Sequence, residues 1–127
     1  MQALADNGLI SPGAPFNDEI EWTWFHLWHQ DGRRARNGAA VMAPNYTQWY
    51  GSYEVARHFY QDLIPQARRL AQRAIADGHA EQGRRVLAVI DEVLSAPEHR
   101  WAGGKIDPAE LAAWKEAHEK FSERYAQ

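Results

Sequence analysis

One pattern constrains the fold more than any other: apolar residues recur at alternating steps of four and three along residues 46–76. This spacing marks one face of a helix and is sustained over several turns. Such a helix would be about 40 Å long at 1.5 Å per residue. Pro65 should kink it, because proline removes a backbone donor and clashes one turn back. The apolar positions are Trp49, Tyr53, Ala56, Tyr60, Leu63, Ala67, Leu70 and Ala74.

A first helix is predicted over residues 18–36. Asn17 would cap its start, and acidic residues follow in the first turn, where they favour the helix dipole. Asn37 and Gly38 would end the helix, because both residue types tolerate a left-handed C-cap. Residues 1–15 are read as an irregular lead-in.

Two further helices are predicted, over residues 81–95 and 108–125. The second of these has the clearest start: Asp107 would cap it, Pro108 would stand at the first helical position and Glu110 would complete a capping box. Its apolar stripe, predicted to be buried, comprises Leu111, Trp114, His118, Phe121 and Tyr125.

No run of period-two alternation suggests a strand. The sequence therefore predicts an all-α fold, a four-helix bundle-like arrangement with one long kinked second helix. The 127 residues suffice for one core and form a single predicted domain, 1–127.

Composition excludes several classes of function. The chain has no Cys, so it cannot form disulfides, thiolate metal sites or a covalent haem attachment through a C-x-x-C-H motif. A formal net charge of −3 argues against nucleic-acid binding. No apolar run is long enough for a membrane span, and residues 1–15 do not have the pattern of a signal peptide.

The aromatic residues crowd into one half of the chain, between Trp22 and Tyr60. Along the first predicted helix they occupy two sides, with Trp22 and Phe25 on one and Trp24 and Trp28 on the other. A helix that is apolar on two sides must be covered on two sides. A partner protein, a flat cofactor or a longer parent chain could supply the cover, or the helix could be a central core helix.

Histidines and arginines accompany these aromatic residues. His26 and His29 share a helix face with Glu21, which is compatible with a metal site, although structural histidines or histidines packed on a cofactor edge explain them as well. The run Arg33, Arg34 and Arg36 could bind carboxylates or phosphates, or could serve as cations at a helix C-terminus. No motif for a nucleophile, a phosphate loop or a dinucleotide is present, so no catalytic residue is assigned.

Two segments resemble a known family. Residues 15–39, which include HQDGRRARNGA, and residues 43–54, APNYTQWYGSYE, resemble the C-terminal, haem-poor helical region of multihaem c-type cytochromes of the octahaem, hydroxylamine oxidoreductase-like group. The resemblance covers residues 9–70. The family pattern carries His at the position of Tyr50, Glu at Asp31 and Gly at Ala43. If that His ligates a haem in relatives, ligation cannot be carried over to Tyr50.

The resemblance implies a helical module of, or partner to, a multihaem cytochrome subunit, supporting electron transfer or redox chemistry of small nitrogen compounds. Haem c would come from another chain or an upstream region, and any oxidoreductase activity would belong to the assembly. A periplasmic or extracellular location and an oligomeric state are expected. The implied haem-side residues are His26, His29, Arg33, Arg34, Arg36, Tyr46, Trp49, Tyr50 and His58.

Two alternatives remain open on the residues alone. The first is a helical interaction or oligomerisation module without redox function, which would use the long second helix and the stripe of residues 111–125. The second is a metal-binding helical bundle built on His26, His29 and Glu21.

Overall fold

The structure is a computed structural model that describes residues 1–104 and 106–125, without the side chain of Tyr125. The all-α prediction is confirmed, since the described residues form helices and contain no strand. The chain divides into two compact units, residues 1–91 and 92–127, and the single domain stays a prediction. No described helix has the length and apolar character needed to cross a membrane.

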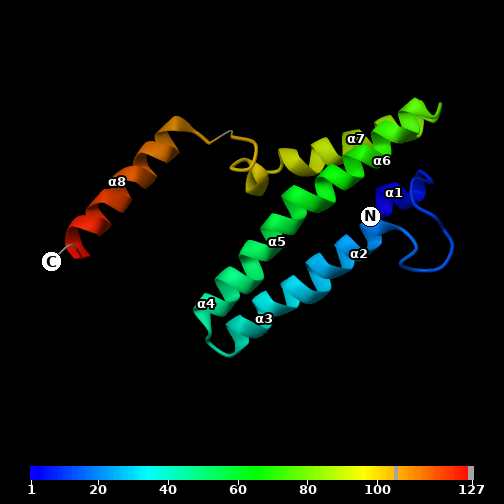
Figure 1. Ribbon diagram of the computed structural model, residues 1–127. Coiled ribbons are helices and arrows are strands. Elements are labelled where there is room, and N and C mark those ends of the chain that lie inside the picture. The colour runs from blue at the N-terminus through cyan, green and yellow to red at the C-terminus, as the bar shows by residue number, and fades with distance from the viewer. Residues whose placement is uncertain (105, 126–127) are drawn as a thin grey trace. The chain divides into compact units, whose positions relative to one another are not determined.

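Two antiparallel helices form a hairpin in the first unit (Figure 1). The first helix is continuous through α2 (Glu19–Phe25), η1 (His26–Asp31) and α3 (Gly32–Ala40). The second runs through α4 (Pro44–Thr47), η2 (Gln48–Ser52), α5 (Tyr53–Arg57), η3 (His58–Leu63) and α6 (Ile64–Ala76). The three η segments are π-helical: they are wider turns within otherwise α-helical stretches.

The ends of the first helix differ from the prediction. Its N-cap is Asp18 rather than Asn17, and the Glu21 carboxylate accepts a hydrogen bond from the Asp18 backbone N–H at 3.1 Å. The helix does not end at Gly38, which is buried inside it. A Cβ on Gly38 would lie 2.5 Å from the Thr47 hydroxyl, so this glycine allows the two helices to approach closely and does not act as a C-cap. The left-handed residue in the following turn is Met42, at φ 54°.

Glycine also sets the spacing of the helices further from the turn. A Cβ on Gly51 would lie 2.5 Å from the Cα of Ala35 in the opposite helix. The buried line of the second helix therefore begins at Gly51 and continues through Leu63, Ala67 and Ala71. Trp49 and Tyr53, which share the predicted apolar stripe with Leu63 and Ala67, are exposed. The π-helical turns account for this difference along the stripe, because each takes more residues per turn and rotates the face that a 3.6-residue period extrapolates.

The helix is not interrupted at Pro65. The π-helical segment η3 ends two residues before Pro65, and α6 carries the proline in its first turn. A widened turn just before the proline relieves the clash of its ring with the preceding turn. The kink itself stays a prediction.

The other helices of the first unit complete its core. α1 (Gln2–Asp6) lies inside the segment predicted to be irregular, and its Leu4 is buried. α7 (Ala80–Ser95) packs against α6 at Gly83, where a Cβ would collide with the Ala71 carbonyl oxygen. Arg68 of α6 pairs with Asp91 of α7 at 3.0 Å. The core residues are Leu4, Ile20, Leu27, Leu63, Ala67, Ala71, Val86 and Ile90.

The second unit contains η4 (Pro97–His99) and α8 (Pro108–Tyr125), whose range agrees with the prediction. Asp107 caps α8 by accepting a hydrogen bond from the Ala109 N–H at 2.8 Å. Glu110 pairs with Arg100 rather than with the cap. The prediction that the stripe of α8 is buried is wrong: Trp114 is 65% exposed and Phe121 is exposed too, while the side chain of Tyr125 lies outside the described residues. The four-helix arrangement stays a prediction.

Candidate functional site

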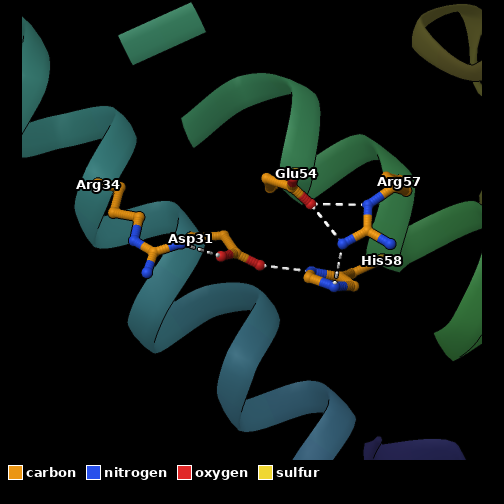
Figure 2. A network of polar contacts seen from close by, with 5 residues as sticks. All are labelled: Asp31, Arg34, Glu54, Arg57 and His58. Carbon is orange, nitrogen blue, oxygen red and sulfur yellow. Dashed lines mark hydrogen bonds and ion pairs between the residues drawn. The ribbon is translucent and has the colours of Figure 1, made fainter. Parts of the chain in front are cut away.

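A buried acid–imidazole pair joins the two helices of the hairpin. Asp31 is 2% exposed and is the buried charged residue among those that the structure describes. Its Oδ2 atom lies 2.6 Å from Nδ1 of His58 on the opposite helix (Figure 2). Asp31 ends η1 and His58 begins η3, so both partners lie at boundaries of π-helical segments.

The buried carboxylate is compensated on its other side as well. The Asp31 Oδ1 atom lies 3.6 Å from Nη1 of Arg34, one turn along the same helix. Burial of a carboxylate is costly unless it is paired and hydrogen-bonded. Among the described side chains, no buried nitrogen or oxygen lacks a hydrogen-bond partner. The pair is therefore a satisfied polar contact inside an otherwise apolar helix interface.

The second ring nitrogen of His58 faces a cation. Arg57 Nη2 lies 3.0 Å from His58 Nε2, and the Nε atom of Arg57 donates to Glu54 Oε2 at 2.7 Å (Figure 2). The hydrogen bond with Glu54 raises the pKa of Arg57 above its ordinary value. Because a guanidinium only donates, His58 Nε2 must accept, and Nδ1 then holds the hydrogen that is donated to Asp31. The four side chains Asp31, Glu54, Arg57 and His58 are called the network below.

The close approach of the two helices at Gly51 sets which residues of the network lie opposite one another. Gly51 opposes Ala35, so Asp31, four residues before Ala35, comes level with the turn of Glu54, Arg57 and His58. Both partners border π-helical turns. Such turns occur frequently at functional sites, which makes the network the best-defined candidate site in the hairpin.

The remaining predicted histidines lie on the first helix. His29 stacks on Phe25 with ring centroids 4.6 Å apart, and its Nε2 lies 2.6 Å from Nη2 of Arg33. His26 is exposed, and its ring meets Phe25 edge-on. Glu21 is occupied at the helix N-cap. The described residues include no group of three or more His, Asp or Glu able to hold a metal, so nothing supports the metal-binding alternative.

The arginine run divides into two environments. Arg34 forms an ion pair with Asp31, whereas Arg33 and Arg36 are exposed. No acidic residue occurs in residues 32–53, which form the closed end of the hairpin. This end of the molecule is therefore cationic.

Four aromatic residues are exposed at the same end. Tyr46 and Tyr50 have ring centroids 5.5 Å apart, and Trp49 and Tyr53 have theirs 6.0 Å apart. Trp49 is 59% exposed, and the other three are comparably exposed. An open pocket of about 870 Å³ borders Trp49 and Tyr53 and continues to the turn at Met42. Tyr46, Trp49, Tyr50 and Tyr53 are called the tip surface below.

These residues fit some contacts with a haem and not others. The tip surface could pack against the face or edge of a porphyrin that another chain or region holds. The imidazoles of His29 and His58 do not fit an axial-ligand role as arranged, because their Nε2 atoms face Arg33 and Arg57. Neither histidine is therefore arranged to ligate a haem iron.

Sequence reasoning selected His58 but missed its partner. Leu27 follows the buried Ile20 by seven residues, and Asp31 follows Leu27 by four. The available signal was therefore an acid on the apolar stripe of the first helix. Its partner could not be found in this way, because it lies 27 residues away on another helix.

Comparisons with known proteins found no matching family model, no similar curated protein and no similar solved structure.

Proposed function

We propose that this chain is a helical docking module of, or a partner to, a multihaem c-type cytochrome, with its haems supplied by another chain or by an upstream region. The observation that carries the proposal is the tip surface, where four aromatic side chains are exposed on one end of a hairpin. Exposed aromatic clusters of this kind mark surfaces that bind a partner.

The cationic character of the same end supports the proposal. Arg33 and Arg36 are exposed in a segment that contains no acid. Arginine guanidinium groups suit carboxylates, including haem propionates, because they bind them in paired geometry. The module would contribute packing and positive charge, and the electron transfer or the redox chemistry of small nitrogen compounds would belong to the haems. In this proposal the assembly is periplasmic or extracellular and oligomeric.

A haem c peptide, in which the haem is attached to a short C-x-x-C-H segment, provides a direct test. Titrated into the full chain, it should quench tryptophan fluorescence in a saturable manner. The double variant Trp49→Ala/Tyr50→Ala should weaken binding by about tenfold, which corresponds to about 1.4 kcal/mol. Trp114→Ala, the same kind of change at an exposed site of the second unit, is the matched control and should bind as the unmodified chain does.

Two results would contradict the proposal. One is the absence of saturable quenching. The other is an equal loss of affinity in the double variant and in the Trp114→Ala control, since binding would then not involve the tip surface.

A second candidate is an oligomerisation module without redox function. The exposed stripe of α8 favours it, because Leu111, Trp114 and Phe121 follow the three–four spacing of a helix-pairing face. Sedimentation of the full chain over a range of concentrations tests this candidate. A mass that rises with concentration, and that Trp114→Ala lowers, would support it; a constant monomer mass would exclude it.

A further inference from the structure

The network contains a contact that depends on the protonation state of one ring. Arg57 Nη2 lies 3.0 Å from His58 Nε2, and this contact is a hydrogen bond only while Nε2 has a free lone pair. Imidazole side chains commonly change charge between about pH 5 and pH 8. The geometry of the network therefore applies to one of the two charge states of His58.

A second proton on His58 would act differently on its two neighbours. Nε2–H and the Arg57 guanidinium would face each other as two donors, and the contact would become repulsive. The contact from Nδ1 to Asp31, 2.6 Å long, would become charge-assisted and stronger. The His58 ring would keep its contact with Asp31, and the Arg57 guanidinium would have to move away from Nε2.

The carboxylate of Glu54 can replace Arg57 as the partner of His58 Nε2. Glu54 precedes His58 by four residues on the same helix, and its carboxylate now binds Arg57. Side chains four apart in a helix lie within contact distance. Glu54 can therefore turn from the guanidinium to the protonated ring, which would leave His58 between two carboxylates.

The charges around the ring favour this exchange. From the first helix His58 faces Asp31, which Arg34 accompanies; on its own helix it faces Glu54 and Arg57. Asp62 acts on Arg57 through space. The two carboxylates beside the ring and the two guanidinium groups balance, so one more proton makes the cluster cationic. Arg57 is the cation best able to leave, because its side chain is already 39% exposed.

We propose that His58, Glu54 and Arg57 form a proton-operated switch in which protonation of His58 exchanges Arg57 for Glu54 and releases the Arg57 guanidinium to the surface. The hairpin itself stays joined, because the Asp31–His58 contact persists in both states. The switch is independent of the proposed function, since it rests on the network alone.

Side-chain NMR of the full chain tests the exchange. A titration between about pH 5 and pH 8 would follow the ring nitrogens of His58, the Nε signal of Arg57 and the carboxyl carbon of Glu54. The switch predicts that all three change together with one midpoint. Arg68, which pairs with Asp91, is the internal control and should not follow that midpoint.

The proposal is overturned if His58 gains its proton while the Arg57 and Glu54 signals stay constant or change at a different pH. A second variant guards against an indirect cause: in His58→Gln the Arg57 signal should become independent of pH over this range. A folded His58→Gln chain in which Arg57 still titrates as before would also overturn the switch.

Discussion

The two ends of the hairpin are held together by different means. At the open end, where α7 packs on α6, large aliphatic side chains such as Ile20, Leu63, Val86 and Ile90 are buried. At the closed end of the first unit, two helices meet, and the buried contacts are made by Gly38, Gly51 and their neighbours. The network lies between these two regions.

The difference shows how the number of packed helices decides which residues can be buried. A third helix offers a second surface over which aliphatic side chains can interdigitate. Two helices alone can bury only the side chains along the narrow strip where they touch. Because glycine has no side chain, it reduces the buried apolar surface of that strip further. The aromatic residues of the closed end consequently remain on the outside, where they form the tip surface.

The largest expected effect is at the open end. Ile20→Ala should lower the free energy of unfolding by about 2–5 kcal/mol, because it removes a fully buried side chain and leaves a cavity. Urea unfolding followed by circular dichroism measures the change. Val89→Ala, at a partly exposed position of α7, should cost less than about 1 kcal/mol. Equal costs for the two variants would show that the open end does not hold the apolar core.

At the closed end, a substitution that adds side-chain volume should destabilise the chain. Gly51→Ala should destabilise the chain by about 1–3 kcal/mol, because the new Cβ would lie 2.5 Å from Ala35 and force the helices apart. Gly32→Ala is the matched control: its Cβ meets Arg36 only at 3.5 Å, so it should stabilise by about 0.5–1 kcal/mol through helix propensity. Thermal unfolding of both variants checks the opposite signs, and a neutral Gly51→Ala would contradict the close approach.

The network should contribute less than the apolar core. Asp31→Asn should cost about 1–3 kcal/mol, because it removes the charge from a buried hydrogen bond to His58. Asp91→Asn, in the exposed pair with Arg68, should cost at most about 1 kcal/mol. Denaturant unfolding at neutral pH compares these two cross-helix aspartates. Similar small losses would mean that burial of Asp31 adds nothing to its contact.

The smallest expected effect appears at alkaline pH. Burial raises the pKa of Tyr60 above its ordinary value of 10.0. The folded state then retains the phenol proton longer than the unfolded state, so this contribution is intact below about pH 10 and is lost as the pH rises further. Unfolding measured at about pH 9 and about pH 11 should show a steeper loss for the unmodified chain than for Tyr60→Phe. If both chains lose stability equally over this range, the burial of Tyr60 is not the cause of the loss.

Sequence patterns predicted the helices well and their faces less well. The caps and spacing around Asp107 were sufficient for α8, because a capping residue acts within one turn of its own helix. The helical spacing places Trp49 and Tyr53 on one stripe with Leu63 and Ala67, but only the latter two are buried, because the π-helical turns change the period. Of the network, the sequence singled out His58 alone, and as a haem-side residue. Its contact with Asp31 could not be predicted, because the two residues are 27 apart in sequence and lie on different helices.

By itself, the sequence determined the all-α class, the positions of the main helices and the absence of covalent haem attachment, since helix spacing, local caps and the lack of cysteine are properties of the chain alone. The tertiary structure alone decided that Gly38 and Gly51 serve helix contact, that Asp31 pairs with His58 and that the tip aromatics are exposed. The physical reason is that burial, close approach and ion pairing depend on which distant residues lie opposite one another, and that depends on how the helices pack.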